Sequence, residues 1–380
     1  MIVTKKMTTV SQLRDFVKFP FSLFGNNPYW APPIINEEME VIDRRKNPVF
    51  KNAEAHFFMA YRDQKPVGRI AAIINWLEVK DQKTPKVRFG WFDAVDDIEV
   101  TKALLDEVEK VGQEHGLTFM EGPVGFSNMD KAGMLVDGFE EFNTMITWYS
   151  MPYYHHHFEQ LGFAKEKEWV EYKIRVPKCG PDDRVNRFAG MIMNRYGMRV
   201  IRFKNKNEII QYVDKIFDLI NDTYRNLSTY VPIQPEQVAY YKKKYFRYIQ
   251  PDFINCVADK NGDIVAFAIT MPSFTEALQR ANGRLLPFGW MHLAKTLRTH
   301  HKADFYLIGI KPEYQNKGLT AIIFKEMTEM FNRRGITEVE TNPELEDNKA
   351  IQALWSKYDN ELHKRRRTYR KDIGKLVISN

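Results

Sequence analysis

The sequence predicts an α/β protein of two domains, each a mixed, mostly antiparallel central sheet flanked by helices. Two observations lead to this fold class: the chain of 380 residues exceeds one ordinary core, and strand and helix patterns alternate along both halves. A third is the segment 175–181, where two prolines and a glycine interrupt the periodic patterns and indicate a linker. We therefore expect one domain at residues 1–178 and a second at 179–380.

The second half gives the clearer order of elements. Apolar residues recur at helical spacing in 209–224, and Asn261-Gly262 is typical of a tight hairpin between two β-rich runs. The helix that begins at Leu319 is expected to end at Gly335. The expected order is strand 198–203, helices 209–224 and 234–248, strands 253–258, 264–271 and 305–310, helix 319–334, strand 336–341, helix 346–358 and a strand within 362–373.

The first half repeats the later part of this order with little sequence similarity. Two strand patterns flank a turn at 63–66, a third strand and a helix follow, and Gly116 ends that helix. An internal duplication of one fold is the economical explanation. The expected elements are strands 57–62, 67–75 and 87–92, helix 100–115, and strands 117–121 and 169–174.

Composition and charge are those of a folded, soluble protein. The chain is 44% hydrophobic and 28% charged, it has no apolar run of the ~18 residues that a membrane helix needs, and its start lacks the apolar stretch of a signal peptide. We expect a cytoplasmic protein with no membrane partner. The net charge of +7 favours anionic partners but does not separate a nucleic acid from a phosphorylated cofactor.

Metal and disulfide chemistry are not expected. Cys179 and Cys256 lie far apart in the sequence, and neither belongs to a Cys-x-x-Cys pair. The histidines at 155–157 are consecutive, so no two of them have the i, i+4 spacing that lets one helix face hold an ion. We predict no metal site, and these histidines could instead form a titrating rim to an acceptor pocket.

The segment 315–320 has the form of an anion-binding helix start. The first amide groups of a helix lack intrahelical partners, and the helix dipole places partial positive charge there. Gly318 lets the backbone approach a ligand closely, Lys317 adds a positive charge, and Thr320 adds a hydroxyl donor. The alternative is a plain strand-to-helix turn with Gln315 near the cap.

The sequence around this helix start, IGIKPEYQNKGLT at 308–320, resembles the central motif of the GNAT N-acyltransferases. That family has a strand, a Pro-containing loop, then Gln or Arg, two residues, Gly, one residue, and Gly or Ala. The last position here is Thr320, which narrows the room for a pyrophosphate but can donate a hydrogen bond. The motif lies between a strand and an amphipathic helix, as the mechanism of this family requires.

The resemblance implies two tandem GNAT-like domains, of which the second binds acetyl-CoA or another acyl-CoA. The acyl group, expected to be acetyl, would pass to an amine of a small molecule or a peptide. The phosphates would lie on the helix start and the pantetheine arm along the preceding strand. The cofactor-binding residues implied are Ile308, Gly309, Ile310, Gln315, Asn316, Lys317, Gly318, Leu319, Thr320 and Asn348.

The general acid and base are the least defined part of the expected site. Many family members use a tyrosine on the next helix to protonate the leaving CoA thiolate, and Trp355 stands at that place here. Tyr358, three residues further on, could substitute for it or could be a packing aromatic, and water could carry the proton instead. Glu313 is the candidate for deprotonating the amine.

The first half resembles a degenerate copy of the same domain. Its matching turn, 92–99, has four carboxylates and no glycine, so Asp96 or Asp97 would cap the helix and occupy its amides. The segment 158–163 resembles the family's Tyr-x-x-Leu-Gly-Phe signature, with Phe158 in place of the tyrosine. We expect this copy to serve structure or acceptor binding.

A glycine-rich loop at 121–139 is either a substrate loop of this first half or a plain surface connection. Its candidate substrate-binding residues are Ser127, Asn128 and Asp130.

Two other functions remain open. An aminoacyl transferase of the Fem type, which uses charged tRNA, would exploit the basic run at 364–371, although a solvated edge strand is the plainer interpretation. A non-catalytic CoA-binding protein would fit the aromatic residues Trp355 and Phe158 at the two tyrosine positions. For the leading function we expect no nucleic acid partner, and the sequence does not decide whether the chain forms a homodimer.

Overall fold

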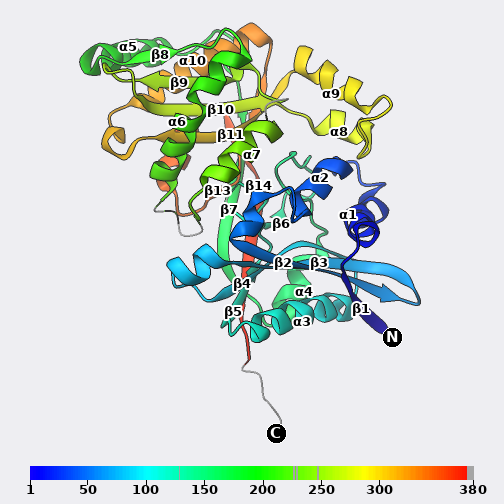
Figure 1. Ribbon diagram of the computed structural model, residues 1–380. Helices are drawn as coiled ribbons and strands as arrows, with labels where there is room; N and C mark the ends of the chain where they lie inside the picture. Colours follow the sequence, from blue (N-terminus) through cyan, green and yellow to red (C-terminus); the bar gives the residue numbers. More distant parts are fainter. Residues whose placement is uncertain (128, 226, 228–229, 246–247, 375–380) are drawn as a thin grey trace.

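One mixed sheet runs through both halves of the chain, with helices on both faces (Figure 1). The computed structural model describes residues 1–127, 129–225, 227, 230–245 and 248–374. The sheet and its helices confirm the predicted fold class.

The first half contains every strand and helix that its sequence predicts, together with an initial strand, three helices and a short strand that the sequence did not reveal. The elements are β1 (Ile2–Met7), α1 (Val10–Phe24), α2 (Ile35–Ile42), β2 (Ala53–Arg62), β3 (Lys65–Asn75), β4 (Lys86–Ala94), α3 (Ile98–Glu114), β5 (Phe119–Gly122), β6 (Met134–Asp137), α4 (Tyr153–Gln160) and β7 (Ala164–Arg175). The start of α1 is fixed by a capping box in which the Thr9 hydroxyl accepts from the Gln12 amide while the Gln12 side chain accepts from the Thr9 amide.

The second half also follows its predicted order and adds three helices. The elements are α5 (Asp183–Tyr196), β8 (Arg199–Ile201), α6 (Lys206–Tyr224), α7 (Pro235–Tyr245), β9 (Ile254–Ala258), β10 (Ile264–Pro272), α8 (Thr275–Ala281), α9 (Gly289–Arg298), β11 (Lys302–Ile310), α10 (Leu319–Arg334), β12 (Glu338–Glu340), β13 (Glu344–Leu345), α11 (Lys349–Trp355) and β14 (Asn360–Asp372). Gly335 ends α10 in the left-handed conformation with φ 70°, as predicted.

The two halves share the whole order of elements rather than only its later part. The order strand, two helices, three strands, helix, two strands, helix, strand runs from β1 to β7 and again from β8 to β14. The second half differs by α5, which precedes β8, and by the pair α8 and α9, which stands between β10 and β11. The duplication inferred from sequence is therefore visible along the full length of both halves.

The last strands of the two halves are exchanged. The strand order is β1-β2-β3-β4-β5-β14-β7-β12-β11-β10-β9-β8, so β14 of the second half lies between β5 and β7 of the first. β7 in turn pairs with β12 of the second half. Each half therefore completes the sheet of the other. We still propose that the linker between the two halves lies near residue 178.

The basic run on β14 is not the solvated edge that the sequence suggested. β14 is an interior strand, and the side chains of Lys364 and Arg366 are fully buried. Arg366 Nε lies 2.5 Å from a Glu171 carboxylate oxygen on β7, and Lys364 Nζ lies 3.2 Å from the other oxygen. These two charges are neutralised inside the sheet, so Lys364 and Arg366 are not available to a nucleic acid.

Helices of each half cover opposite faces of its part of the sheet. In the second half, α5 and α10 pack on one face with Val265 and Phe305, whereas α6 and α7 pack on the other with Phe267. In the first half, α3 and α4 share one apolar core, and α1 and α2 share another. Among the described residues, no helix has both the length and the apolar content to cross a lipid bilayer.

Candidate functional site

The strands β11 and β12 separate after a short paired stretch. They run parallel with register Lys302 to Glu338 and Asp304 to Glu340, after which β12 ends and β11 continues to Ile310. A hydrogen bond at 2.7 Å from the Asn342 side-chain amide to the Tyr306 carbonyl crosses the start of this gap. The remaining edge of β11 has no strand partner among the described residues, and we call it the slot; the Tyr224 hydroxyl donates to its Ile308 carbonyl at 2.9 Å.

A β-bulge at Tyr306 marks the slot. The pairing of β10 with β11 passes from Ile269–Leu307 to Thr270–Phe305, which leaves Tyr306 as the extra residue. Tyr306 is only 7% exposed, and its hydroxyl has no hydrogen-bond partner among the described residues. Burial raises the pKa of Tyr306 well above its usual value, so the hydroxyl stays protonated and is available as a donor.

The helix start predicted to bind phosphate lies at the end of the same strand. Gly318 is the N-cap of α10 with φ 83°, and no side chain of the described residues caps this start. Asn316 is also left-handed, with φ 61°, and the Gln315 side chain donates to the Ile310 carbonyl at 3.2 Å. The first-turn amides at Leu319 and Thr320 therefore have no side-chain cap, which is the arrangement that an anion site at a helix start needs.

The missing side chain of Gly318 has a second role. A Cβ at this position would lie 2.8 Å from a ring carbon of Phe188 and 3.3 Å from Ile192, both on α5. The Lys317 ammonium lies 5.6 Å from the centre of the Tyr196 ring on the same helix. The loop is thus held by α5, an element that the sequence analysis did not detect.

Trp355 and Tyr358 lie away from the slot, on the face covered by α10. The buried Trp355 indole N–H donates to both carboxylate oxygens of Glu344 at 2.8 Å. Tyr358 follows α11 rather than belonging to it, and its ring packs 5.7 Å from that of Phe324. Burial raises the pKa of Tyr358 to about 12. The structure places both residues among packing aromatics.

Two further residues of the predicted site have structural partners. Asn348 is the N-cap of α11, where its side-chain oxygen accepts from the Ile351 amide at 3.4 Å. Glu313 is exposed and pairs with Lys311 at 2.8 Å. Neither contact brings these side chains to the slot.

The first half has the same strand separation, but its slot is filled by its own chain. β4 and β5 pair in parallel at Lys86–Phe119 to Arg88–Glu121 and then diverge. The loop after β5 enters the gap, where the Val124 amide donates to the Phe89 carbonyl at 2.8 Å. Asp97 caps α3, its side chain accepting from the Glu99 amide, as the sequence predicted. Both parts of a CoA site are therefore occupied in the first half.

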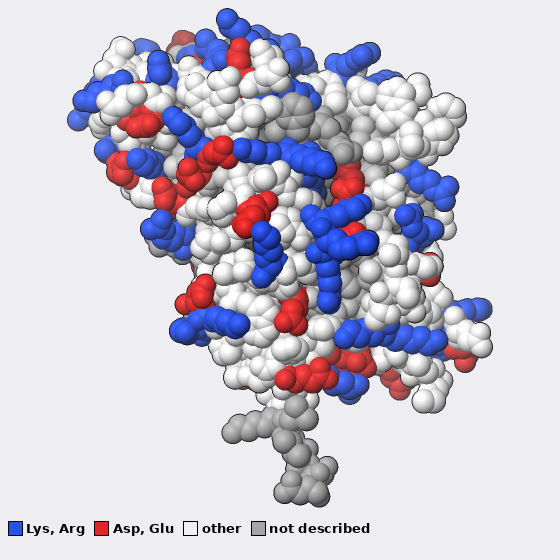
Figure 2. All heavy atoms as spheres, in the orientation of Figure 1, with Lys and Arg blue, Asp and Glu red and all other residues white. Residues whose placement is uncertain are grey.

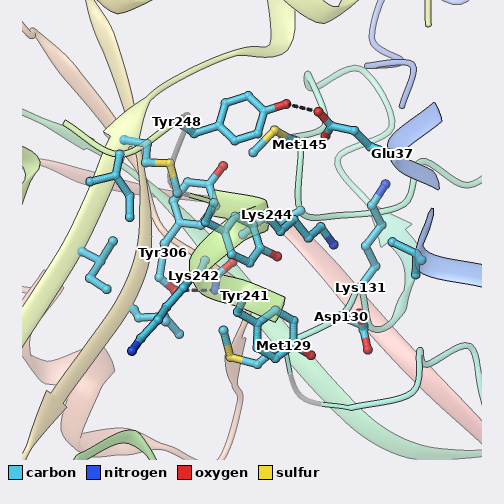
Figure 3. A pocket seen from close by; sticks show the side chains of 18 of the residues that line it. Glu37, Met129, Asp130, Lys131, Met145, Tyr241, Lys242, Lys244, Tyr248 and Tyr306 are labelled. Atoms are coloured by element: carbon cyan, nitrogen blue, oxygen red, sulfur yellow. Dashed lines mark hydrogen bonds between the residues drawn. The ribbon is translucent and has the colours of Figure 1, made fainter. Parts of the chain in front are cut away.

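A cavity of about 580 Å³ lies between the two halves and reaches the slot of the second half (Figure 3). Its wall is mostly apolar and includes Ile216 and Phe217 of α6, Trp91 of β4, and Leu278 of α8. Tyr306, Leu307 and Asn342 bring the slot into the same cavity. A ligand held along β11 would therefore meet an apolar chamber of the size of small-molecule binding sites.

Charged groups of both signs interrupt the apolar wall, with carboxylates on α2 and lysines at Lys131 and at 242–244 on α7. The Tyr248 hydroxyl donates to Glu37 of α2 at 2.6 Å, and both residues line the cavity (Figure 3). Tyr248 and Tyr306 belong to one packed cluster. The Trp91 indole donates to Glu38 of the same helix. The two carboxylates on α2 thus belong to the wall of the same cavity that Tyr306 lines.

The glycine-rich loop of the first half also lines the cavity, through Asp130. Asp130 accepts from the Ser127 amide at 2.9 Å and from the Ser127 hydroxyl at 3.2 Å. The Ser127 and Tyr241 hydroxyls lie 3.3 Å apart, which joins the loop to α7 of the second half. Burial raises the pKa of Asp130. Asn128 lies outside the described residues.

The sequence analysis missed Tyr306, Glu37 and Tyr248 as functional candidates. A bulge depends on pairing with a neighbouring strand, so nothing in the local sequence marks Tyr306. The signal for α2 was available: apolar residues at Ile34, Ile35, Val41 and Ile42 enclose an acidic pair. The histidines at 155–157 lie on α4, where His157 Nδ1 is 2.9 Å from the Thr101 hydroxyl.

Comparisons with known proteins agree on the fold. Protein YghO of Escherichia coli (strain K12) is 27% identical over 369 residues, covering 96% of this chain and 93% of that protein. The bacterial ceramide synthase of Caulobacter vibrioides (strain NA1000 / CB15N) is 25% identical over 378 residues, covering 96% of each. No protein-family model matches the chain.

Among solved structures, the tandem GNAT protein from the clavulanic acid biosynthesis pathway covers 98% of this chain and 99% of its own, with TM-score 0.57 and 10% identity. A GCN5-related N-acetyltransferase from Sphaerobacter thermophilus covers 98% and 96%, with TM-score 0.52 and 10% identity. The chain therefore has the tandem GNAT fold, as the sequence predicted.

Proposed function

We propose that this protein is an acyl-CoA-dependent N-acyltransferase that joins an acyl group to an amine carrying a long apolar chain. The observation that supports it is the apolar cavity of about 580 Å³ that opens at the slot between β11 and β12. The slot suits a pantetheine arm, the helix start beyond it suits phosphates, and the cavity suits hydrocarbon. An acceptor of this kind would fill the space between the two halves.

The residues that would hold the acyl-CoA are those of the predicted motif. The first-turn amides of α10 and the side chains of Lys317 and Thr320 would bind the phosphates. The backbone of β11 from Tyr306 to Ile310 would bind the pantetheine. The fit rests on the positive φ of Gly318 and on the absence of a side-chain cap at this start among the described residues. Asn348 and Glu313 have no part in this proposal.

The bound acyl-CoA supplies an activated thioester, and the chain supplies orientation and proton transfer. The amine nitrogen forms a bond to the thioester carbon as the carbon–sulfur bond breaks, the departing thiolate takes up a proton from a donor on the chain, and the second proton that the nitrogen gives up returns to that donor. We assign the donor of that proton to the Tyr306 hydroxyl, which is buried, protonated and unpartnered at the bulge. Glu37, linked to the same cluster through Tyr248, would accept the proton that the acceptor ammonium must lose.

The first half would bind the acceptor rather than a second CoA. Its helix α2 supplies Glu37 and Glu38, and its glycine-rich loop supplies Asp130, whose carboxylate accepts from the Ser127 amide. These groups can bind an ammonium and neighbouring hydroxyls while the chain lies among apolar side chains. The named activity of the Caulobacter relative, a ceramide synthase, involves this type of molecule, and it favours a long acyl group over the acetyl group that the motif alone suggests.

The test is turnover measured over a grid of substrates. The full-length protein is incubated with acyl-CoAs from two to eighteen carbons and with amines of increasing chain length, including a long-chain 2-amino alcohol, while CoA thiol release and amide mass are recorded. Each methylene buried in the cavity contributes about 0.8 kcal/mol, so kcat/KM should rise about fourfold per methylene until the cavity is full. Equal turnover of short amines, or no thiol release with any pair, would overturn the proposal.

A further inference from the structure

The pair α8 and α9 forms a hairpin that exposes large apolar side chains at its tip. Between β10 and β11, Leu286 is 77% exposed and Phe288 is 68% exposed. Trp290 and Met291, on the first turn of α9, are also exposed. Four neighbouring apolar side chains on one projection form a contiguous surface of the kind that marks a binding site. We call residues 284–291 the hairpin tip.

The hairpin is an addition specific to the second half. At the equivalent position of the first half, β3 and β4 are joined by residues 76–85, and none of the exposed large apolar residues of the described chain lies there. The repeated fold therefore does not require this element. Its tip is held in shape by its own contacts, since the Trp290 indole donates to the Pro287 carbonyl at 3.0 Å.

Basic side chains surround the tip. Residues 275–301 contain four Lys or Arg side chains, all exposed, and a single acidic one, Glu276. The four are Arg280, Arg284, Lys295 and Arg298. Figure 2 shows a surface poor in acidic groups at the upper right, where Figure 1 places α8 and α9. An apolar, aromatic tip with a basic surround is complementary to a bilayer whose headgroups are anionic.

The inner side of the hairpin belongs to the wall of the cavity. Leu278 of α8 lines the cavity, and Leu293 of α9 packs in the same cluster as Tyr306 and Tyr248. The outer side of the same hairpin exposes the tip. The hairpin therefore has one side in the packed cluster at the cavity and its tip in solvent.

We propose that the hairpin tip docks the protein on the surface of an anionic lipid bilayer, with Leu286 and Phe288 inserted among the acyl chains and the basic side chains on the headgroups. This departs from our expectation that the protein has no membrane partner, because that expectation rested on membrane-spanning segments alone. The docking does not depend on the proposed reaction. It places the cavity next to a source of apolar substrates.

The test is co-sedimentation of the full-length protein with vesicles. Binding should be strong to vesicles with 30 mol% phosphatidylglycerol in phosphatidylcholine, weak to phosphatidylcholine alone, and reduced by raising the salt concentration. Leu286→Ser/Phe288→Ser should lower the partition coefficient by at least about tenfold. Trp290 is left in place because it shapes the turn.

The matched control is Val3→Ser/Val10→Ser, which removes two exposed apolar side chains from the first half and should leave binding unchanged. Arg284→Gln/Lys295→Gln should weaken binding to the anionic vesicles only. Melting temperatures and mass by light scattering accompany each variant. Equal vesicle binding by the hairpin variant and the wild type would overturn the proposal. So would a wild type that does not bind vesicles but self-associates, if the hairpin variant is monomeric.

Discussion

Glu99 and Thr320 occupy the same position in the two halves, the second residue of α3 and of α10. In the first half a carboxylate stands beside the helix start and Asp97 caps it, whereas in the second half a hydroxyl stands there and glycine precedes it. Opposite chemistry at equivalent positions separates a start that repels phosphate from one that can bind it.

Thr320→Glu should therefore abolish CoA binding, because it places a carboxylate at the start of α10 as Glu99 does at the start of α3. Ligand at about 100 times its dissociation constant stabilises a protein by about 2.7 kcal/mol, which raises the melting temperature by a few degrees. The wild type should show this shift with CoA and the variant should not. Gly318→Glu is the poorer test, because φ 83° and the Phe188 contact would strain any side chain there.

The control for this prediction is Glu99→Thr, the reciprocal change in the first half. It should leave the CoA-induced shift intact, since the slot of that half is filled by its own loop. A Thr320→Glu variant that keeps the full shift would show that the phosphates bind elsewhere.

Tyr306→Phe should lower kcat about 10²-fold while leaving the CoA-induced thermal shift nearly unchanged. The change removes only the hydroxyl at the bulge, so the leaving thiolate loses its proton donor while the ring still fills the wall. Tyr358→Phe is the comparison, because that tyrosine packs against Phe324 away from the slot; its kcat should fall less than about threefold. Measurement of kcat at saturating acyl-CoA distinguishes the two variants. A larger loss of kcat in Tyr358→Phe than in Tyr306→Phe would make Tyr358 the general acid.

The parts that the sequence predicted well depend on local chemistry. Helical spacing located α6 and α10, and Asn261-Gly262 located a hairpin in which Gly262 has φ 88°. The uncapped start of α10 and the capped turn at Asp97 also follow from residues within one turn of a helix. These features can be predicted from the sequence because they depend on contacts between residues that are close together in the chain.

The parts that the sequence missed depend on partners far away in the chain. The basic run of β14 suggested a solvated edge because Lys364 and Arg366 are charged, yet Glu171 neutralises them from a strand nearly two hundred residues earlier. The bulge at Tyr306 and the cavity between the halves arise only when distant strands and helices meet. The filled slot of the first half has the same origin, since Val124 and Phe89 meet across diverging strands.

Arg366→Ala should destabilise the protein by about 3 to 5 kcal/mol, because it leaves the buried Glu171 carboxylate without its closest partner. Arg370→Ala on the same strand is the control; its side chain is 42% exposed, pairs with Asp372 at 3.3 Å and lies 3.8 Å from the centre of the Phe119 ring, so the loss should be about 1 kcal/mol or less. Urea unfolding measures both. If Arg366→Ala fails to fold, Arg366→Lys is used instead, because it keeps the charge but loses the hydrogen bond to the Trp148 carbonyl. Its loss of unfolding free energy should lie between those expected for the two alanine variants. Equal effects at both positions would mean that β14 is not buried between the halves.

Glu344→Gln should stabilise the protein at alkaline pH and have little effect at acidic pH. Burial raises the pKa of the Glu344 carboxyl in the folded state to about 8, against an ordinary value of 4.5. The folded state therefore binds more protons than the unfolded state between these values. The contribution of Glu344 to stability is fully present below pH ~4.5 and is lost as pH rises toward 8. Glutamine cannot ionise, and its side-chain oxygen still accepts from the Trp355 indole.

The difference between variant and wild type should accordingly grow from near zero at pH 5 to about 1 to 3 kcal/mol at pH 9, measured by urea unfolding at fixed ionic strength. Glu346→Gln is the control of opposite sign, because a hydrogen bond from Lys165 lowers the pKa of that carboxyl and the charged form stabilises the fold above pH ~4.5. That control should be slightly less stable than wild type at pH 7, since its ion pair is exposed. A Glu344→Gln effect that is independent of pH would show that the carboxyl near Trp355 does not titrate in this range.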